Sequence, residues 1–296
     1  MRTSLLLSAA VLVVSAALNS AQEPDDTRQI VAEEFVKARP GKKAARPAPR
    51  YTVKKPATPD KAADSKGVLA ELGVTVWRLR PAAASDQDSR LLVQDDGGAT
   101  GWVPERVDAG QRLAIGDRVR LSFETPVSGY LYVLDREEYS DGTHSDAYLI
   151  FPTERPVGAR NEVKGGRLIE IPARDDRPNY FTVRQSRADQ VAEVLTAIVS
   201  SQPVPELPLA AGPTRLPAGL LDRWSAEWGG PVEELVRSGE GGRGWSASED
   251  QAGAEPSRLL TQDDPPPQTI YRTRARPGRP LLVHIRLPYG TNAPRP

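Results

Sequence analysis

The stretch from Ile115 to Pro152 constrains the fold more than any other part of the chain. Its first segment alternates, with Val119, Leu121 and Phe123 on one face and polar residues on the other; this pattern is typical of a half-buried strand. Residues 130–134 (YLYVL) are apolar on both faces, as expected of a central strand. A polar tip over 135–146 leads to 148–151 (YLIF). The stretch therefore predicts two or three antiparallel strands.

Shorter segments of the same kind follow the chain on both sides of this stretch. We predict strands at 74–79, 91–93, 101–104, 168–171, 180–183 and 194–199, with a longer helix as the alternative for the last, and a closing hairpin from 269–275 and 281–287. A helix is predicted over 220–228, where Leu220, Leu221, Trp224 and Trp228 share one face. A capping box at Ser186 and the segment 231–236 predict further helical turns. The fold class is mainly β, an antiparallel, Ig-like two-sheet sandwich with one or two short helices.

The N-terminus has the pattern of a secretory signal peptide. Arg2 precedes an apolar run from Leu5 to Leu18, and small residues then allow cleavage after Ala17 or after Ala21. The alternative, a membrane anchor, needs ~20 apolar residues. Residues 1–21 are therefore predicted to be a signal peptide, and the mature protein to be exported to the periplasm or secreted.

Residues 22–67 are predicted to form a disordered linker that includes a basic arm rich in Pro and Ala, with a short helix as the alternative within 22–36, where Ile30, Val31, Phe35 and Val36 give weak amphipathic character. Nine basic residues and one acidic residue lie between Lys37 and Lys61, and five prolines interrupt any helix there. Such an arm is either a solvated spacer or an electrostatic tether to an anionic envelope polymer or lipid head group. The tether hypothesis rests on Lys42, Lys43, Arg46, Arg50, Lys54 and Lys55.

The sandwich domain is predicted to span residues 68–289, with a tail at 290–296. Residues 239–267 are rich in Gly, Ser, Asp and Pro and predict a mobile loop within it.

Composition excludes several kinds of site. The chain has no cysteine, which excludes disulfides, thiolate nucleophiles and Cys-ligated metals. It has two histidines, His144 on the polar tip and His284 on the outward face of a late strand, and no G-x-S-x-G motif. The acids of the 135–146 tip supply enough oxygens for calcium, but their spacing departs from an EF-hand loop. No catalytic, cofactor or metal residues are predicted, and the formal net charge of zero gives no general attraction to nucleic acid.

A family resemblance rests on the order of several short motifs. Residues 129–133 (GYLYV), 141–142 (DG), 149–152 (LIFP), 161–165 (NEVKG) and 171–172 (IP) resemble the bacterial family called domain of unknown function 4384. The resemblance covers about residues 115–200. It implies a β-sandwich module of exported proteins and brings no catalytic residues.

The function expected from the sequence is therefore that of an exported, non-catalytic module that binds a protein or an anionic envelope component. The alternative is a divergent, glycoside-type hydrolase in which two loop carboxylates converge in a pocket.

Overall fold

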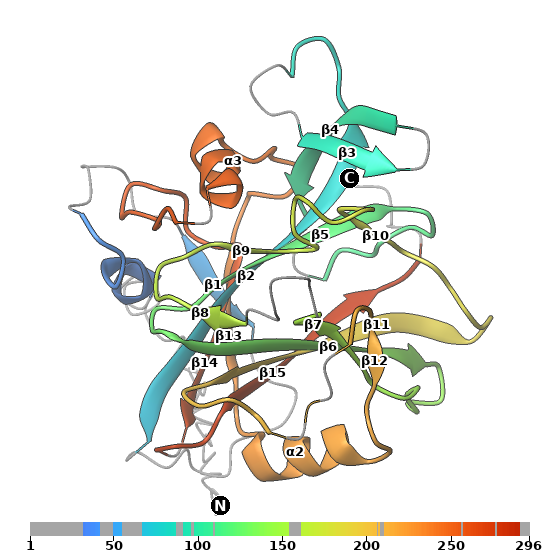
Figure 1. Ribbon diagram of the computed structural model, residues 1–296, viewed down its shortest axis with the longest axis vertical. Helices are drawn as coiled ribbons and strands as arrows, with labels where there is room; N and C mark the ends of the chain where they lie inside the picture. The colour runs from blue at the N-terminus through green and yellow to red at the C-terminus, as the bar shows by residue number, and fades with distance from the viewer. Residues whose placement is uncertain are drawn as a thin grey trace, which may run out of the picture.

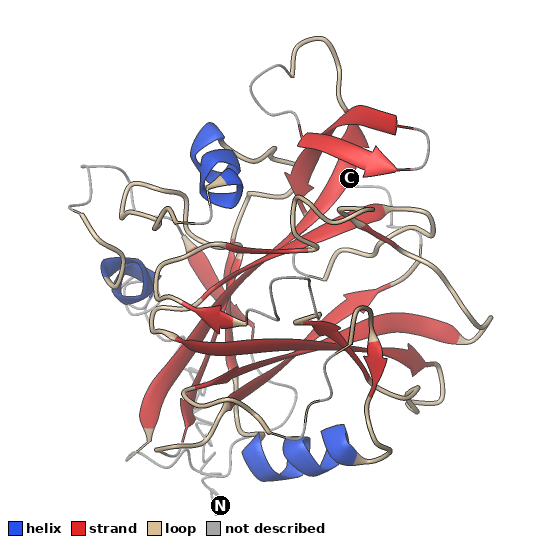
Figure 2. Cartoon of the chain, viewed as in Figure 1, coloured by secondary structure: helices blue, strands red, loops and turns tan. Residues whose placement is uncertain are grey.

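The computed structural model describes residues 32–41, 50–54, 67–86, 91–95, 98–108, 110–153, 161–205, 207, 210–255, 257–275 and 277–290. Two antiparallel sheets face each other across the molecule (Figure 1). Figure 2 shows that strands make up most of the body and that the helices lie at its periphery. The predicted antiparallel β-sandwich is confirmed. The predicted signal peptide lies outside the described residues.

The larger sheet, sheet I, has nine strands. Its spatial order is β1 (Tyr51–Lys54), β13 (Glu233–Arg237), β14 (Thr269–Ala275), β2 (Val68–Pro81), β4 (Gly98–Arg106) and β3 (Leu91–Asp95). β5 (Arg118–Glu124) also pairs with β2, and β9 (Ile169–Ile171) and β10 (Phe181–Thr182) pair with β5. β3 and β4 pair as a hairpin in which Asp95 lies opposite Gly98.

The smaller sheet, sheet II, has six strands. Its spatial order is β12 (Thr214–Arg215), β7 (Tyr148–Phe151), β6 (Gly129–Tyr139), β11 (Gln190–Ser200) and β15 (Leu281–Pro288), and β8 (Glu162–Val163) pairs with β6. The predicted strand at 194–199, for which a longer helix was the alternative, is part of β11, so the prediction of a strand is confirmed.

The main core lies between the sheets. Leu121 and Phe123 of β5 meet Leu131 and Val133 of β6 there, all nearly inaccessible to solvent. The alternation of each strand places these side chains on one face because successive residues point to opposite sides. On the outer face of sheet II, the helix α2 (Leu220–Trp228) covers a second apolar cluster with the predicted face of Leu220, Leu221 and Trp224.

The prediction of a disordered linker over 22–67 is wrong for residues 32–41 and 50–54. Residues 32–37 are helical, and Phe35 packs against Tyr51, Leu235 and Ile270. β1 pairs with β13 as the edge strand of sheet I. The sandwich therefore begins well before residue 68, because a few buried side chains anchor an otherwise polar segment.

The prediction of a mobile loop over 239–267 is also wrong. The segment contains the helix α3 (Ala247–Ala254), which begins with a capping box between Ser246 and Glu249. Trp245 just before it is buried, edge-on to Trp77 with ring centroids 6.3 Å apart. Buried aromatic and charged side chains fix this segment despite its polar composition.

Three local predictions also fail. Residues 233–237 form β13 instead of a helical turn, and the segment at Ser186 is a turn outside any helix. β14 and β15 are strands as predicted, but they do not pair: β14 lies between β13 and β2, and β15 lies beside β11. Their apolar faces meet across the core, where Tyr271 and Ile285 belong to one cluster.

Candidate functional site

Among the described residues, no strand pairs with the outer edge of β15, which lies beside a cavity, and only Leu113 bridges to the end of this edge at Tyr289. Tyr289 N–H donates to the Val191 carbonyl at 2.9 Å, and the register continues from there with Leu287 opposite Glu193. Because antiparallel pairs alternate between bonded and non-bonded positions, the backbone N–H and C=O groups of His284 and Arg286 point away from β11. β15 is the last strand of sheet II, and no described strand pairs with that edge.

A groove runs along this edge, and we call it the edge groove. It encloses a cavity of about 130 Å³. Five consecutive residues of β15, 284–288, form one wall, which shows that the strand presents its backbone edge there. Val74 and Val76 of β2, Tyr271 of β14 and Leu113 supply an apolar floor. Lys54, Asp108 and Glu234 contribute polar groups to its lining.

Gln268 places a buried acceptor beside this groove. Its side chain is 2 % exposed, and its Nε2 donates to the Arg237 carbonyl at 3.0 Å. Its backbone N–H donates to Thr75 Oγ1, also at 3.0 Å. Among the described residues, nothing donates to Gln268 Oε1. A buried acceptor without a donor costs free energy, so the groove contains a position where a bound donor would be favoured.

The lining of the groove includes a phenol and an ion pair. Burial raises the pKa of Tyr271, and the carboxylate of Glu234 raises it further, so the phenol stays neutral. Lys54 Nζ lies 3.7 Å from Glu234 Oε2, and its side chain is 61 % exposed. The groove thus combines an apolar floor with a neutral phenol and a solvated ion pair.

A second cavity, which we call the acidic pocket, lies on the inner face of sheet II and encloses about 240 Å³. Asp135, Glu137 and Glu193 line it, and they continue the inward-facing positions of Val133 and Leu195 along β6 and β11. Asp146 and Tyr148 close it from the side of β7.

Hydrogen bonds hold two of these carboxyl groups. Tyr289 Oη donates to Glu193 Oε1 at 2.6 Å, and Tyr139 Oη donates to Glu137 Oε2 at 2.7 Å. Burial raises the pKa of Asp135 well above its ordinary value, and the charge and contact of Glu193 raise it further. Burial also raises the pKa of Glu193.

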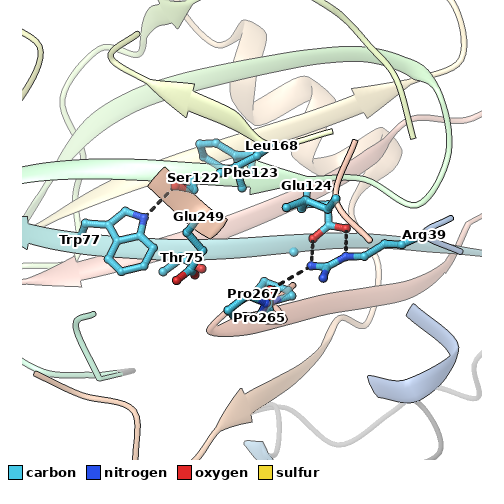
Figure 3. Close-up of a pocket in the computed structure, with 12 residues that line it drawn as sticks. Arg39, Thr75, Trp77, Ser122, Phe123, Glu124, Leu168, Glu249, Pro265 and Pro267 are labelled. Carbon is cyan, nitrogen blue, oxygen red and sulfur yellow. Dashed lines mark hydrogen bonds and ion pairs between the residues drawn. The ribbon is translucent and has the colours of Figure 1, made fainter. Parts of the chain in front are cut away.

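A third polar cluster, drawn in Figure 3, is part of the packed interior. Arg39 forms an ion pair with Glu124, and Trp77 Nε1 donates to Ser122 Oγ at 2.7 Å. The space between these groups is about 10 Å³, at the lower limit for one water molecule. The cluster stabilises the join between the N-terminal segment and sheet I and leaves no room for a ligand.

Two of the six proposed tether residues lie in the described part of the chain. Arg50 is exposed just before β1, and Lys54 is the last residue of β1 and pairs with Glu234. The other four, Lys42, Lys43, Arg46 and Lys55, lie outside the described residues.

The acids of the 135–146 tip are divided between separate places. β6 extends to Tyr139, and Asp135, Glu137 and Asp146 line the acidic pocket, while Asp141 accepts hydrogen bonds from Thr143 at the turn. Within the described residues, no group of three or more His, Cys, Asp or Glu side chains could hold a metal ion. The calcium hypothesis therefore has no ligand set in this part of the chain.

The two histidines lie on the outer side of sheet II. His284 Nδ1 lies 2.9 Å from Thr196 Oγ1, and its Nε2 is 3.5 Å from Ser225 Oγ. Ser225 donates instead to the Leu221 carbonyl at 2.8 Å. The threonine occupies the position that an orienting acid has in a serine hydrolase, so this contact lacks the arrangement of a catalytic triad.

The signals that could have found these sites are charged residues at apolar positions of a strand. Asp135 follows Leu131 and Val133 at a spacing of two, and Glu193 precedes Leu195 at the same spacing. The pattern was interpreted as a polar tip that includes Asp135 and a later strand that begins at Val194. The inward position of Asp135 and Glu193 was therefore not predicted. Gln268 has no such signal, because its partners come from distant segments.

Comparison with protein-family models, with curated proteins and with solved structures finds no match to this chain. The resemblance to domain of unknown function 4384 stays a prediction. None of the helices in the described parts of the chain is long and apolar enough to cross a membrane.

Proposed function

We propose that this protein is an exported, non-catalytic binding module that takes an extended segment of a partner protein along the edge groove. The observation that carries the proposal is the unpaired backbone of His284 and Arg286 beside an apolar groove. Donors and acceptors spaced along a strand edge are complementary to another extended polypeptide backbone.

The groove lining supports the same type of occupant. A side chain of the added segment would lie against Val74, Val76 and Tyr271, and a donor of the segment would satisfy Gln268 Oε1. Export follows from the pattern of residues 1–21.

The proposal is tested by a proline at the free edge. Arg286→Pro removes an N–H that points away from β11, so the ladder with β11 keeps its bonds. Arg286→Ala is the matched control, because it removes the same side-chain bond to Glu138 and keeps the N–H. A photocrosslinking residue at Gln111, which lines the groove, reports the partner in the native cells, and one at Val127, which is 64 % exposed elsewhere, is the reference position.

We expect one dominant adduct from position 111, lost with Arg286→Pro and kept with Arg286→Ala. An adduct equally strong in both variants, or one that forms from position 127 instead, would contradict strand addition at β15.

The basic segment supplies an electrostatic tether in this proposal. The prolines and charges of residues 42–49 and 55–61 support a polar extension that binds an anionic envelope component. Deleting residues 37–61 would also remove Arg39 and β1, so the sharper variant is K42Q/K43Q/R46Q/K55Q. Salt-sensitive sedimentation with envelope fractions should be lost in this variant. Sedimentation that persists unchanged in high salt would mean that the segment is only a spacer.

The glycoside-hydrolase alternative finds less support. Asp135 and Glu193 line the acidic pocket or its border, but they come from strands, and their oxygens Oδ1 and Oε2 are buried. Glycosidases place their two carboxyl groups about 5 Å or more apart to admit the sugar. Carboxyl oxygens that are buried from solvent are not presented to such a substrate.

A further inference from the structure

Two carboxyl groups of the acidic pocket are diagonal neighbours on adjacent strands. Asp135 lies opposite Leu195, and Glu193 lies opposite Glu137, so Asp135 and Glu193 share the inner face one step apart. Diagonal neighbours of this kind are within reach of long side chains.

The oxygens between these groups lack donors. Asp135 Oδ1 and Glu193 Oε2 are both buried, and no donor among the described residues reaches either one. The two carboxyl groups are nevertheless within reach of each other, because they are diagonal neighbours on one face of the sheet. Two ionised carboxylates offer only acceptors, so the two groups form a hydrogen bond with each other only when one of them carries a proton.

We propose that Asp135 and Glu193 hold one proton between them, and that this proton fixes the end of β15 through Tyr289. A single proton satisfies both buried oxygens. Without the proton the two carboxylates would repel each other. With it, Glu193 stays in place, where its Oε1 accepts from Tyr289 Oη and from Gln190 Nε2, the latter at 3.1 Å.

Tyr289 carries the effect to the edge groove. Its carbonyl accepts from Arg112 Nη1 at 2.6 Å, and the neighbouring Pro288 carbonyl accepts from Leu113 N–H at 2.8 Å. Leu113 and Pro288 both line the groove. The proton therefore stabilises one end of the groove wall. The expected effect on partner binding rests on the proposed function, whereas the shared proton itself is independent of that function.

The charges around the pair come from every element packed against it. Glu137 and Arg136 belong to β6, Asp146 and Tyr148 lie on the side of β7, Gln190 belongs to β11 and Tyr289 follows β15. Arg136 is directed to Asp222 on the opposite face, with Nη1 3.1 Å from Oδ1. Arg215 forms an ion pair with Asp146, so the carboxylate of Glu137 is the neighbouring charge that favours retention of the proton.

The sign of the pH dependence follows. Both carboxyl groups have pKa values raised above those of the unfolded chain, which lie near 4. The native state thus binds more protons than the unfolded state above about pH 4. Stability from this pair is fully present below that pH and is lost as the pH rises through the raised pKa values.

The decisive measurement is a carbon-13 NMR titration of the side-chain carboxyl groups in the full chain. We expect Asp135 and Glu193 to titrate together, with one step displaced upward from the ordinary range. Two independent titrations near pH 4 would overturn the proposal. This measurement uses the unaltered protein and needs no variant to fold.

Urea unfolding across pH gives a second test. For each unit by which the pH rises within this window, loss of the shared proton should lower the folding equilibrium constant by up to about tenfold. Asp135→Asn supplies a permanent N–H in place of the proton and should flatten this dependence. Asp146→Asn, at an acid in the same pocket, is the matched control and should leave it intact. Parallel profiles for the wild type and Asp135→Asn would refute the shared proton.

Hydrogen exchange tests the connection to β15. The amide of Leu113, bonded to Pro288, should exchange faster as the pair loses its proton, after correction for intrinsic exchange, and should do so in the wild type and in Asp146→Asn. Unchanged protection at Leu113 while the pair titrates would refute the connection through Tyr289.

Discussion

Arg39 and Glu124 form a bidentate ion pair in which both hydrogen bonds, Nε to Oε1 and Nη2 to Oε2, measure 2.7 Å. The two side chains are 1 % and 3 % exposed. Arg39 Nη1 also donates to the Asp264 carbonyl at 2.8 Å. One guanidinium thus joins the N-terminal segment to β5 and to the segment before β14, three parts of the chain that are far apart in sequence.

Arg39→Ala should destabilise the protein by about 3–5 kcal/mol, because it leaves the Glu124 carboxylate buried without a partner. Arg39→Met combined with Glu124→Leu should cost less than the single change, since it removes both charges. Urea unfolding followed by circular dichroism measures both. Arg215→Ala breaks an exposed pair with Asp146 and should change stability by less than about 1 kcal/mol. Equal decreases in the free energy of unfolding for Arg39→Ala and Arg215→Ala would contradict the assignment of Arg39 to the interior.

Trp245→Ala should cost about 3–5 kcal/mol, the usual range for removing a buried tryptophan. Trp245 is 3 % exposed, and the guanidinium of Arg174 lies 4.8 Å from its ring centroid. The sequence analysis placed Trp245 in a mobile loop, which would make this substitution nearly neutral. Chemical denaturation distinguishes the two outcomes, and Trp102→Ala at a half-buried ring provides the comparison.

The pKa of His284 should lie below its ordinary 6.5, toward about 4. Burial is the main cause, and the positive charge of Arg136 adds to it. Because the folded-state value is the lower one, the stability associated with a neutral ring is present above pH 6.5 and is lost as the pH falls toward 4. Titration of the ring protons by NMR measures the value. Arg136→Gln should raise it, and a value at or above 6.5 in the wild type would contradict the electrostatic description.

The parts of the fold that sequence could predict are those in which local pattern and final environment agree. The alternation in 118–123 and the apolar run in 130–134 gave β5 and β6, and the face of Leu220, Leu221 and Trp224 gave α2. The pairing of β14 and β15 could not be inferred, because an alternating strand does not reveal whether its neighbour lies beside it or across the core.

Average composition misled the prediction where a few side chains decide the structure. Phe35 and Arg39 order a segment that is otherwise basic and polar, and their partners Leu235 and Glu124 are distant in sequence. The Ser246–Glu249 capping box was a readable signal for α3. For the candidate sites, the inward position of Asp135 and Glu193 could have been inferred from the alternation of their strands. The edge groove depends on tertiary contacts that no local pattern specifies.

β2 pairs with β14, with Val68 opposite Ala275 and Val74 opposite Thr269. This pairing constrains the order in which the strands can form sheet I. During synthesis β4 and β5 can pair with the later part of β2 soon after it appears, whereas the neighbour of its first part, β14, comes much later in the chain. Until then the edge of that first part is open to aggregation and to capture by chaperones. The native pairing of sheet I is therefore completed only after β14 has been synthesised.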